Sequence, residues 1–320
     1  GSIQTSEFTF NFALEPFGSM VYYLPVGESK GDWWPKLPEL ETRPVVKVDT
    51  IKLELDKQIP DLLPIRWNKR KEREYLDNDG IYGRHFVYYR TYAPQGKILE
   101  VGRIGHKLIN GTDADEVLVS VHGKRLHIWK EDAYSAYYQL PGDSTITGQV
   151  EVIMLFESKG LHHHTKKIVE DYWGIGVNYV RCNGEELALE YAYTENERGL
   201  NLSKGIVSQE MQTGVGKPYE PLLLWHVYSF ILPEYPHRIW FPYHLRLEHS
   251  GNGFIYLNGH CIGRCWHKGP QREYYIPECW LNLGGENHLV VSLRPTIDGA
   301  DIRKAEIIPV TWMAERRDSW

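Results

Sequence analysis

The sequence predicts an all-β protein with two β-sandwich domains that follow an N-terminal lead-in. Three observations lead to this prediction. Apolar and polar residues alternate with the period of strands, a unit of several strands occurs twice, and no long segment has the 3.6-residue period of an amphipathic helix. Because tight-turn dipeptides separate the strands, we expect helices to be few and short.

The N-terminal lead-in covers residues 1–42. It contains an aromatic strand at 20–24 and a Pro-containing loop with Trp33 and Trp34. Adjacent residues of an extended chain point to opposite sides, so at most one of these two tryptophans is a contact platform.

The first predicted sandwich spans residues 43–178. It begins with the alternating run at 45–55 and continues with a strand over 85–92. The second predicted sandwich spans 179–312, and residues 313–320 form a polar tail. At 320 residues, the chain is long enough for each domain to bury its own core.

A repeated supersecondary unit supports the division into two similar domains. The unit is an alternating strand, a tight turn, a return strand that ends in tryptophan, a tyrosine pair eight residues later, a proline and a closing strand. In the first copy these are 117–121, His122-Gly123, Trp129, Tyr137-Tyr138, Pro141 and 150–156. In the second copy they are 254–257, Asn258-Gly259, Trp266, Tyr274-Tyr275, Pro277 and 288–293.

Composition excludes several classes of function. Hydrophobic content is 42%, and 11 Trp with 21 Tyr make the aromatic share 13%. The net charge of -6 argues against a nucleic-acid partner, because phosphate binding needs a concentrated basic surface. The mean hydropathy is -0.44, and without an apolar run of ~18 residues we expect no membrane span.

The ends of the chain and its cysteines say little about the compartment. Gly1-Ser2 looks like a cleavage scar, so we expect an excised fragment; an extracellular or periplasmic location is favoured without being fixed. Mostly buried free thiols are expected, with a bridge involving Cys279 as the alternative. The four cysteines are Cys182, Cys261, Cys265 and Cys279.

The second copy resembles the C-terminal jelly-roll domains of family 35 glycoside hydrolases, the β-galactosidases. The matching residues are Asn258, Gly259, Gly263, Arg264, Trp266, Gly269, Pro270, Gln271, Tyr275, Pro277, Trp280, Leu281, Gly285 and Asn287. A looser likeness in the first domain rests on Tyr82, Gly83, Tyr89, Arg90 and Thr91. The sequence departs from the family's pattern at Cys265, where an aromatic residue is usual, and at Ser292 and Leu293, near a usual glutamate.

The resemblance implies two galactose-binding-domain-like jelly rolls and places hydrolysis in a separate (β/α)8 barrel. Such a barrel needs ~250 residues of alternating strand and helix, which this sequence does not contain. Acid pairs such as Glu170-Asp171 and Glu185-Glu186 are adjacent in sequence, whereas a retaining glycosidase holds its carboxyl groups ~5 Å apart across a sugar. We therefore assign no catalytic residue.

Carbohydrate binding without catalysis is the function that the residues favour. A sugar presents an apolar C–H face ringed by hydroxyls, which an aromatic platform and planar polar groups recognise. Trp266 and Tyr275 recur in both copies, so a role as core anchors is favoured for these two over contact with a ligand. The candidate carbohydrate-binding residues are Trp33, Trp34, Trp266, His267, Arg272 and Trp280.

No metal site or cofactor is predicted. In an extended segment, His162 and His164 face the same side and His163 does not, and no further ligand stands nearby at metal-binding spacing. The resemblance allows a structural calcium, for which the acidic residues are Asp77, Asp79, Asp113 and Asp115.

The sequence thus predicts a non-catalytic, carbohydrate-binding and structural region of a β-galactosidase-like enzyme. Its expected partners are a galactose-containing oligo- or polysaccharide and the catalytic barrel of the parent chain, with neither nucleic acid nor membrane. A purely structural scaffold without sugar affinity and a hydrolase active on β-galactosides are the alternatives.

Overall fold

The computed structural model describes residues 45–70, 76–81, 85–102, 117–132, 135–142, 147–158, 176–193, 195–207, 220–236, 238–296 and 298–316, with the short strands 2–4 and 9–11. The chain forms two compact units, Gly1–Thr42 and Arg43–Trp320. In the first unit, β1 (Ser2–Gln4) pairs antiparallel with β2 (Thr9–Asn11). The predicted strand at 20–24 and the Trp33-Trp34 pair lie outside the described residues.

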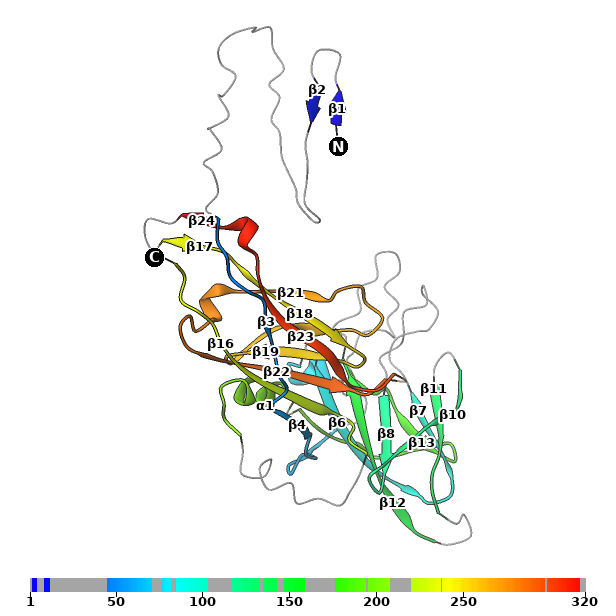
Figure 1. The fold of residues 1–320 in the computed structure, drawn as a ribbon. Helices are drawn as coiled ribbons and strands as arrows, with labels where there is room; N and C mark the ends of the chain where they lie inside the picture. The colour runs from blue at the N-terminus through cyan, green and yellow to red at the C-terminus, as the bar shows by residue number, and fades with distance from the viewer. Residues whose placement is uncertain are drawn as a thin grey trace. The chain divides into compact units, whose positions relative to one another are not determined.

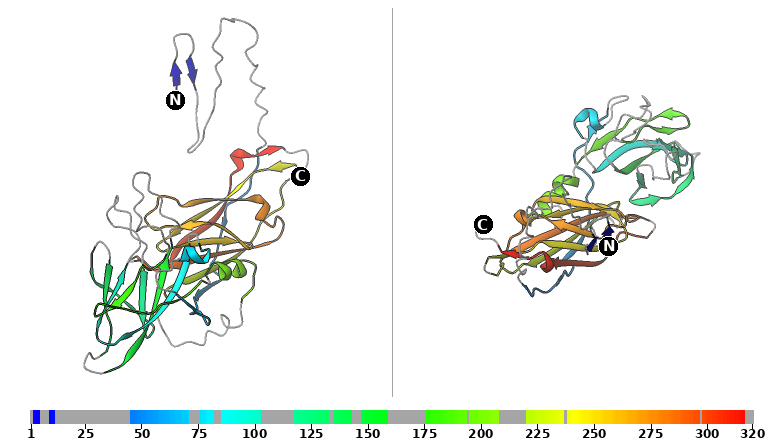
Figure 2. Two further views of the ribbon diagram at one scale, coloured as in Figure 1. Left: turned by 180° about the vertical axis from the view of Figure 1, so that it is seen from behind. Right: turned by 90° about the horizontal axis from the view of Figure 1, so that it is seen from above.

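Two sheets form the first sandwich of the second unit, coloured cyan to green in Figures 1 and 2. The six-stranded sheet has the order β5 (Asn68–Lys69), β15 (Glu190–Ala192), β6 (Phe86–Pro94), β12 (Gln149–Glu157), β8 (Val117–Val121) and β9 (Lys124–Leu126). The five-stranded sheet has the order β10 (Ile128–Glu131), β11 (Ser135–Gln139), β7 (Ile98–Gly102), β13 (Val180–Cys182) and β14 (Glu185–Glu186).

Two further sheets form the second sandwich, whose strands run mainly from yellow to red in Figure 1. One sheet has the order β20 (His260–Cys265), β19 (Asn252–Leu257), β22 (Glu286–Arg294), β16 (Leu224–Ile231) and β4 (Lys57–Pro60). The other has the order β21 (Glu273–Ile276), β18 (Tyr243–His249), β23 (Ile302–Pro309) and β3 (Ile51–Lys52). A separate pair joins β17 (Ile239–Trp240) to β24 (Glu315–Arg316).

Helices are few and short in the described residues, as predicted. The α-helix is α1 (Glu195–Leu202), and the 3-10 turns are η1 (Leu76–Asp79), η3 (Glu278–Trp280) and η4 (Thr311–Met313). None of these is long and apolar enough to cross a membrane. The all-β sandwich prediction is confirmed.

The central strands are apolar on both faces because both faces are covered. In β12, Val152, Met154 and Phe156 pack in the core of the first sandwich, whereas Ile153 and Leu155 point to the opposite side. Successive side chains of a strand alternate between faces, so one strand supplies two hydrophobic layers.

The side chains on the second face meet their counterparts from the second sandwich. In β19, Ile255 and Leu257 belong to the core of the second sandwich, while Phe254 and Tyr256 point the other way. We call the shared layer the middle cluster; its buried members are Phe86, Tyr88, Ile153, Leu155, Leu202, Leu222, Leu223, Trp225, Phe254, Tyr256 and Val290.

Strand pairing differs from the predicted division at residue 178. Although β3 and β4 lie within 43–178, they pair with β23 and β16 of the second sandwich. Conversely, β13, β14 and β15 lie beyond residue 178 and complete the sheets of the first sandwich. Except for β14, which pairs with its neighbour β13, these short strands have partners that are distant in sequence, so contiguity along the chain did not indicate them.

The predicted repeat corresponds to two ladders with the same connectivity. β12 lies between β6 and β8, and β8 pairs with β9; in the second sandwich β22 lies between β16 and β19, and β19 pairs with β20. The turn residues have positive φ in both copies, at 50° and 73° for His122 and Gly123 and at 46° and 86° for Asn258 and Gly259.

Two smaller predictions need correction. Cys182 and Cys265 are buried, but Cys261 and Cys279 are exposed, and all four thiols are free, so a bridge to Cys279 is absent. In the predicted polar tail, Ala314 packs in the core of the second sandwich and Glu315–Arg316 pairs with β17. This part of the tail therefore belongs to the folded domain.

Candidate functional site

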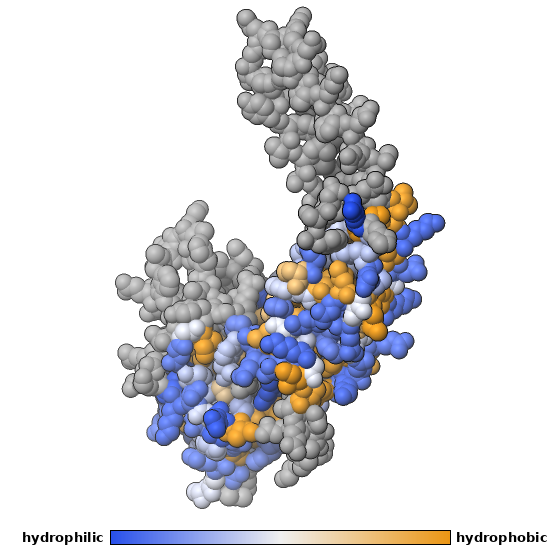
Figure 3. Space-filling view, turned by 90° about the vertical axis from the view of Figure 1, so that its left-hand side faces the viewer, coloured by the Kyte–Doolittle hydropathy of each residue, from blue (hydrophilic) through white to orange (hydrophobic). Residues whose placement is uncertain are grey.

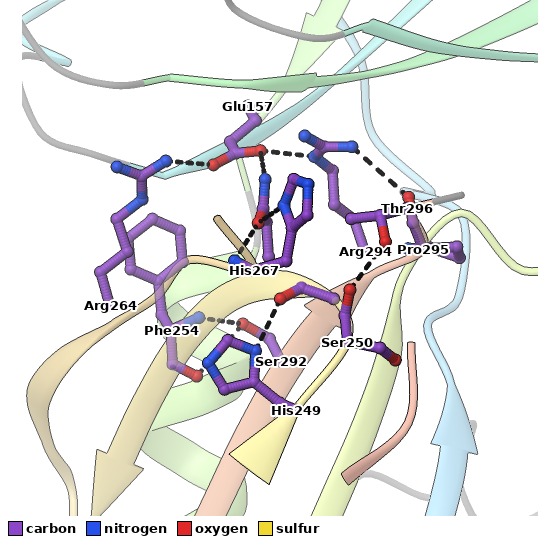
Figure 4. A network of polar contacts seen from close by, with 12 residues as sticks. Glu157, His249, Ser250, Phe254, Arg264, His267, Ser292, Arg294, Pro295 and Thr296 are labelled. Atoms are coloured by element: carbon purple, nitrogen blue, oxygen red, sulfur yellow. Dashed lines mark hydrogen bonds and ion pairs between the residues drawn. The ribbon is translucent and has the colours of Figure 1, made fainter. Parts of the chain in front are cut away.

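The candidate site lies where β19 begins and β20 and β22 end, at the boundary between the two sandwiches (Figure 4). The segment from Trp266 to Arg272, here called the 266–272 loop, leaves β20 at this edge and leads to β21. It contains three of the predicted carbohydrate-binding residues: Trp266, His267 and Arg272. Their positions depend on a buried ion network below the loop.

Glu157 is the centre of this network. It is the last residue of β12 and comes from the first sandwich, yet its carboxylate accepts hydrogen bonds from two arginines of the second. Arg264 Nη2 lies 2.6 Å from Oε1, and Arg294 Nε lies 2.5 Å from Oε2. Both Glu157 and Arg294 are fully buried. Buried charges of this kind need excellent geometry, which the paired arginines supply.

The charge state of Glu157 follows from this pairing. Burial by itself raises the carboxyl pKa, but the charges of Arg294 and Arg264 and their hydrogen bonds outweigh burial and lower the pKa to about 2. Glu157 is therefore an anion at neutral pH, and it ties β12 to β20 and β22.

The network continues into the loop through Asn252. Its Nδ2 donates to Glu157 Oε2 at 3.2 Å, which fixes the orientation of the amide. Its Oδ1 then accepts the backbone N–H of His267 at 2.9 Å and lies 2.7 Å from His267 Nδ1. Because an amide oxygen only accepts, Nδ1 carries the proton. His267 is thus held in one orientation and one tautomer.

Arg272 holds the loop from its other end. Its Nη1 donates to the carbonyl oxygens of Gly269 at 2.8 Å and Gln271 at 2.9 Å, and its Nη2 donates to that of His267 at 3.3 Å. The guanidinium therefore satisfies backbone acceptors of the loop. Its role in this structure is to shape the loop that presents Trp266.

Trp266 is exposed, so the favoured prediction that it is a core anchor is wrong. Its exposed fraction is 37%, and Arg264 lies over the indole with its Cζ 6.0 Å from the ring centroid. Cys265, one residue earlier, takes the buried position, because the chain leaves the sheet directly after β20. Tyr275 is also exposed, whereas its neighbour Tyr274 is buried in the core.

Trp280 lies away from the 266–272 loop. It belongs to η3, and its indole stacks on the ring of His260 with centroids 4.5 Å apart and planes 4° apart. His260 begins β20 and Trp266 follows the end of the same strand, so the two tryptophans stand at opposite ends of it. The structure does not bring all predicted sugar-contact residues together.

Several other predictions fall outside the described residues. These are the pair Trp33 and Trp34, the His162–His164 run, and the acidic residues Asp113 and Asp115. Asp79 is exposed and accepts a hydrogen bond from Tyr191 Oη at 2.5 Å. Within the part of the chain that the structure describes, no three His, Cys, Asp or Glu residues are grouped to hold a metal ion. The calcium site stays a prediction.

The sequence analysis missed Glu157, Asn252 and Arg294. The signal that could have found two of them is the repeat: relative to the turns His122-Gly123 and Asn258-Gly259, Glu157 and Arg294 are the equivalent last residues of the closing strands β12 and β22. Opposite charges at equivalent positions of two copies predict a contact between them.

Comparison with known proteins finds a match for part of the second sandwich. Residues 223–287 match the family described as β-galactosidase, galactose-binding domain. Beta-galactosidase-1-like protein 3 of Homo sapiens is 35% identical over 62 residues, which are 19% of this chain and 9% of that protein. Beta-galactosidase-1-like protein 2 of Homo sapiens is 42% identical over 40 residues, 12% of this chain and 6% of that protein.

The matched segments are short beside the human proteins, since they span less than a tenth of the length of each. Among solved structures, an anti-sigma factor domain-containing protein from Clostridium clariflavum aligns over 72% of this chain and 81% of that chain at 9% identity. The TM-score of this alignment is 0.20, too low to indicate a common fold. The resemblance seen in the sequence is confirmed by the family match: over residues 223–287 the chain is similar to the galactose-binding domain of β-galactosidases.

Proposed function

We propose that this chain is the non-catalytic β-sandwich region of a β-galactosidase-like glycoside hydrolase, which supports the catalytic barrel and binds galactose-containing glycans. The match of residues 223–287 to a galactose-binding domain is the observation that carries the proposal. That segment includes β19, β20 and the 266–272 loop, so the glycan contact is assigned to the second sandwich.

The 266–272 loop has the properties of a glycan contact. Trp266 offers an exposed indole, which packs against the C–H face of a pyranose ring. The loop is held in advance by Arg272 and by the contacts of His267 with Asn252, so little conformational entropy is lost when a ligand binds. A glycan on this surface would therefore bind mainly by stacking of a sugar ring on the indole of Trp266.

The test is affinity electrophoresis in gels containing galactan, followed by calorimetry with galacto-oligosaccharides. Trp266→Ala is expected to abolish retardation while the unfolding temperature stays within about 2 °C, because the side chain is partly exposed. Trp129→Ala is the matched control, since Trp129 is the repeat equivalent in the first sandwich and is 61% exposed. Unchanged retardation of the Trp266 variant, or no retardation of the unaltered protein, would remove the assignment.

A purely structural role is the second candidate, and the buried Glu157 network favours it. This network and the middle cluster fix one sandwich on the other, as a rigid support requires. The scaffold should associate with a separately expressed catalytic barrel and bind no galactan. Failure to co-purify with the barrel, together with retardation in galactan gels, would favour glycan binding alone.

A further inference from the structure

A cavity of about 340 Å³ lies beside the middle cluster, on the face of the six-stranded sheet that meets the second sandwich, and away from the 266–272 loop. Its floor is formed by residues of β6, β8 and β12 that share one face of the sheet. Its side walls come from the segment after β4 and the segment before β16. The lining residues are Asp61, Leu63, Tyr88, Ser120, His122, Gly123, Glu151, Ile153 and Leu222.

At the equivalent position of the second sandwich, a side chain and a helix fill the space. Counting from the two turns, Ser120 of β8 is equivalent to Tyr256 of β19. The Tyr256 ring is buried and packs so closely against Gly199 of α1 that a Cβ there would lie 2.4 Å from Tyr256 Cε2. The first copy thus has a small hydroxyl side chain where the second copy has a bulky aromatic one.

One side wall of the cavity holds a buried acceptor in a fixed position. Asp61 is 2% exposed, and its carboxylate accepts Tyr88 Oη at 2.8 Å, Trp225 Nε1 at 2.9 Å and Arg198 Nη1 at 2.5 Å. These donors come from three different segments, β6, β16 and α1, so the carboxylate cannot reorient freely. Its charge is balanced by Arg198, which makes it an acceptor suited to neutral donors.

The rest of the lining offers further polar groups beside apolar ones. Glu151 is exposed and lies 3.7 Å from Arg90 Nη1, while it also accepts Tyr92 Oη at 3.3 Å. Ser120 supplies a hydroxyl that both donates and accepts. Ile153, Leu63 and Leu222 are the apolar part of the lining. The described lining residues include no Lys or Arg, so they favour a neutral ligand over an anion such as phosphate or sulfate.

We propose that this cavity is a second binding site, which takes a neutral polyhydroxy compound of monosaccharide size. The volume lies at the lower end of the ~300–1,000 Å³ range of small-molecule sites. Hydroxyl groups of the ligand donate to Asp61 and Glu151 and exchange hydrogen bonds with Ser120, and its C–H groups lie on Ile153 and Leu222. This site acts independently of the glycan contact at Trp266.

The test is isothermal calorimetry of the whole chain with galactose, glucose and lactose up to about 50 mM. We expect millimolar binding of at least one monosaccharide. Ser120→Tyr fills the cavity with the side chain that the second sandwich carries, and it is expected to weaken binding by at least about tenfold. Glu151→Gln, at an exposed position that does not endanger the fold, is expected to weaken it about threefold to tenfold.

Glu185→Gln, on the exposed strand β14 away from both proposed sites, is the control and should leave monosaccharide binding unchanged. No heat with any of the three sugars overturns the proposal, and so does binding that neither Ser120→Tyr nor Glu151→Gln weakens. Failure of the glycan proposal looks different: galactan gels then show no retardation, while the calorimetry of monosaccharides still depends on Ser120.

Discussion

The two sandwiches share one connectivity but differ at the face through which they meet. Leu155 in the first copy corresponds to Ser292 in the second, Ser120 to Tyr256, and Glu157 to Arg294. Equivalent faces of the two ladders are packed together in the middle cluster, as in an isologous dimer contained within one chain. The difference teaches that two copies of one unit joined through the same face need complementary residues there, and the charged pair is the clearest case.

The largest effect is expected from breaking this charged pair. Glu157→Gln removes the anion and leaves Arg294 buried without its counter-charge, which should cost about 3–5 kcal/mol of unfolding free energy. Urea denaturation followed by tryptophan fluorescence measures the change. Glu185→Gln on the exposed strand β14 is the control and should stay within about 0.5 kcal/mol. A loss below about 1 kcal/mol in the Glu157 variant would contradict the assigned role of the pair.

The next effect distinguishes two buried carboxyl groups at the same boundary by pH. Burial raises the pKa of Glu195 to about 7 despite hydrogen bonds from Ser292 and Tyr256, and the nearby charge of Asp61 adds to the rise. A carboxyl whose folded pKa exceeds its unfolded value stabilises the fold below the unfolded pKa of 4.5, and this stability is lost as the pH rises through about 7. Glu157, with its pKa lowered to about 2, behaves oppositely: its contribution is present above 4.5 and is lost as the pH falls through about 2.

Glu195→Gln should therefore make the protein less sensitive to alkaline pH. At pH 8 the variant is expected to be more stable than the unaltered protein by ~1–3 kcal/mol, with the advantage gone at pH 5. Urea unfolding at the two pH values gives the measurement. If the variant were equally destabilised at both, Glu195 would be an ordinary ionised hydrogen-bond acceptor.

The fold class could be predicted from the sequence because its signals are local. Alternation in the Phe254–Leu257 run and the Asn258-Gly259 dipeptide fix a hairpin without reference to the rest of the chain. The pairing of β4 with β16 could not be predicted in this way. Leu224 and Pro60 are partners, but most of the first sandwich lies between them in the sequence, so no local pattern connects the two strands.

The candidate site likewise contains a part that could be predicted from a local motif and a part that could not. The 266–272 loop was found because Gly269, Pro270 and Trp266 form a compact motif in the sequence. The contact of Glu157 with Arg294 joins residues from different sandwiches, and neither residue stands in a motif of its own. The exposure of Trp266 could not be predicted from the sequence either. The residue at which β20 ends determines whether Cys265 or Trp266 packs in the core, and the sequence does not mark that residue.

A smaller effect tests the closeness of α1 to the second sandwich. Gly199→Ala would place a Cβ against the Tyr256 ring, which must shift within a buried layer, and we expect a loss of about 1–3 kcal/mol. Glu197→Ala on the same helix is the control, and the better helix propensity of alanine should leave stability almost unchanged. Thermal unfolding by circular dichroism compares the two, and equal midpoints would show that the helix is not seated as described.

The smallest effect compares the two equivalent turns. Asn258 has a φ of 46°, donates from Nδ2 to Trp280 O at 2.7 Å and accepts the His288 N–H at 2.9 Å, so Asn258→Ala should cost about 1–2 kcal/mol in urea unfolding. His122 has a similar φ of 50°, but its position lies beside the cavity in an exposed turn, and His122→Ala should change stability by less than about 0.5 kcal/mol. Backbone strain alone would give both variants the same cost. An equal loss of unfolding free energy at the two turns would therefore show that the asparagine side chain contributes nothing beyond its tolerance of positive φ. The hydrogen bond from Asn258 to the carbonyl oxygen of Trp280 would then not stabilise the hairpin.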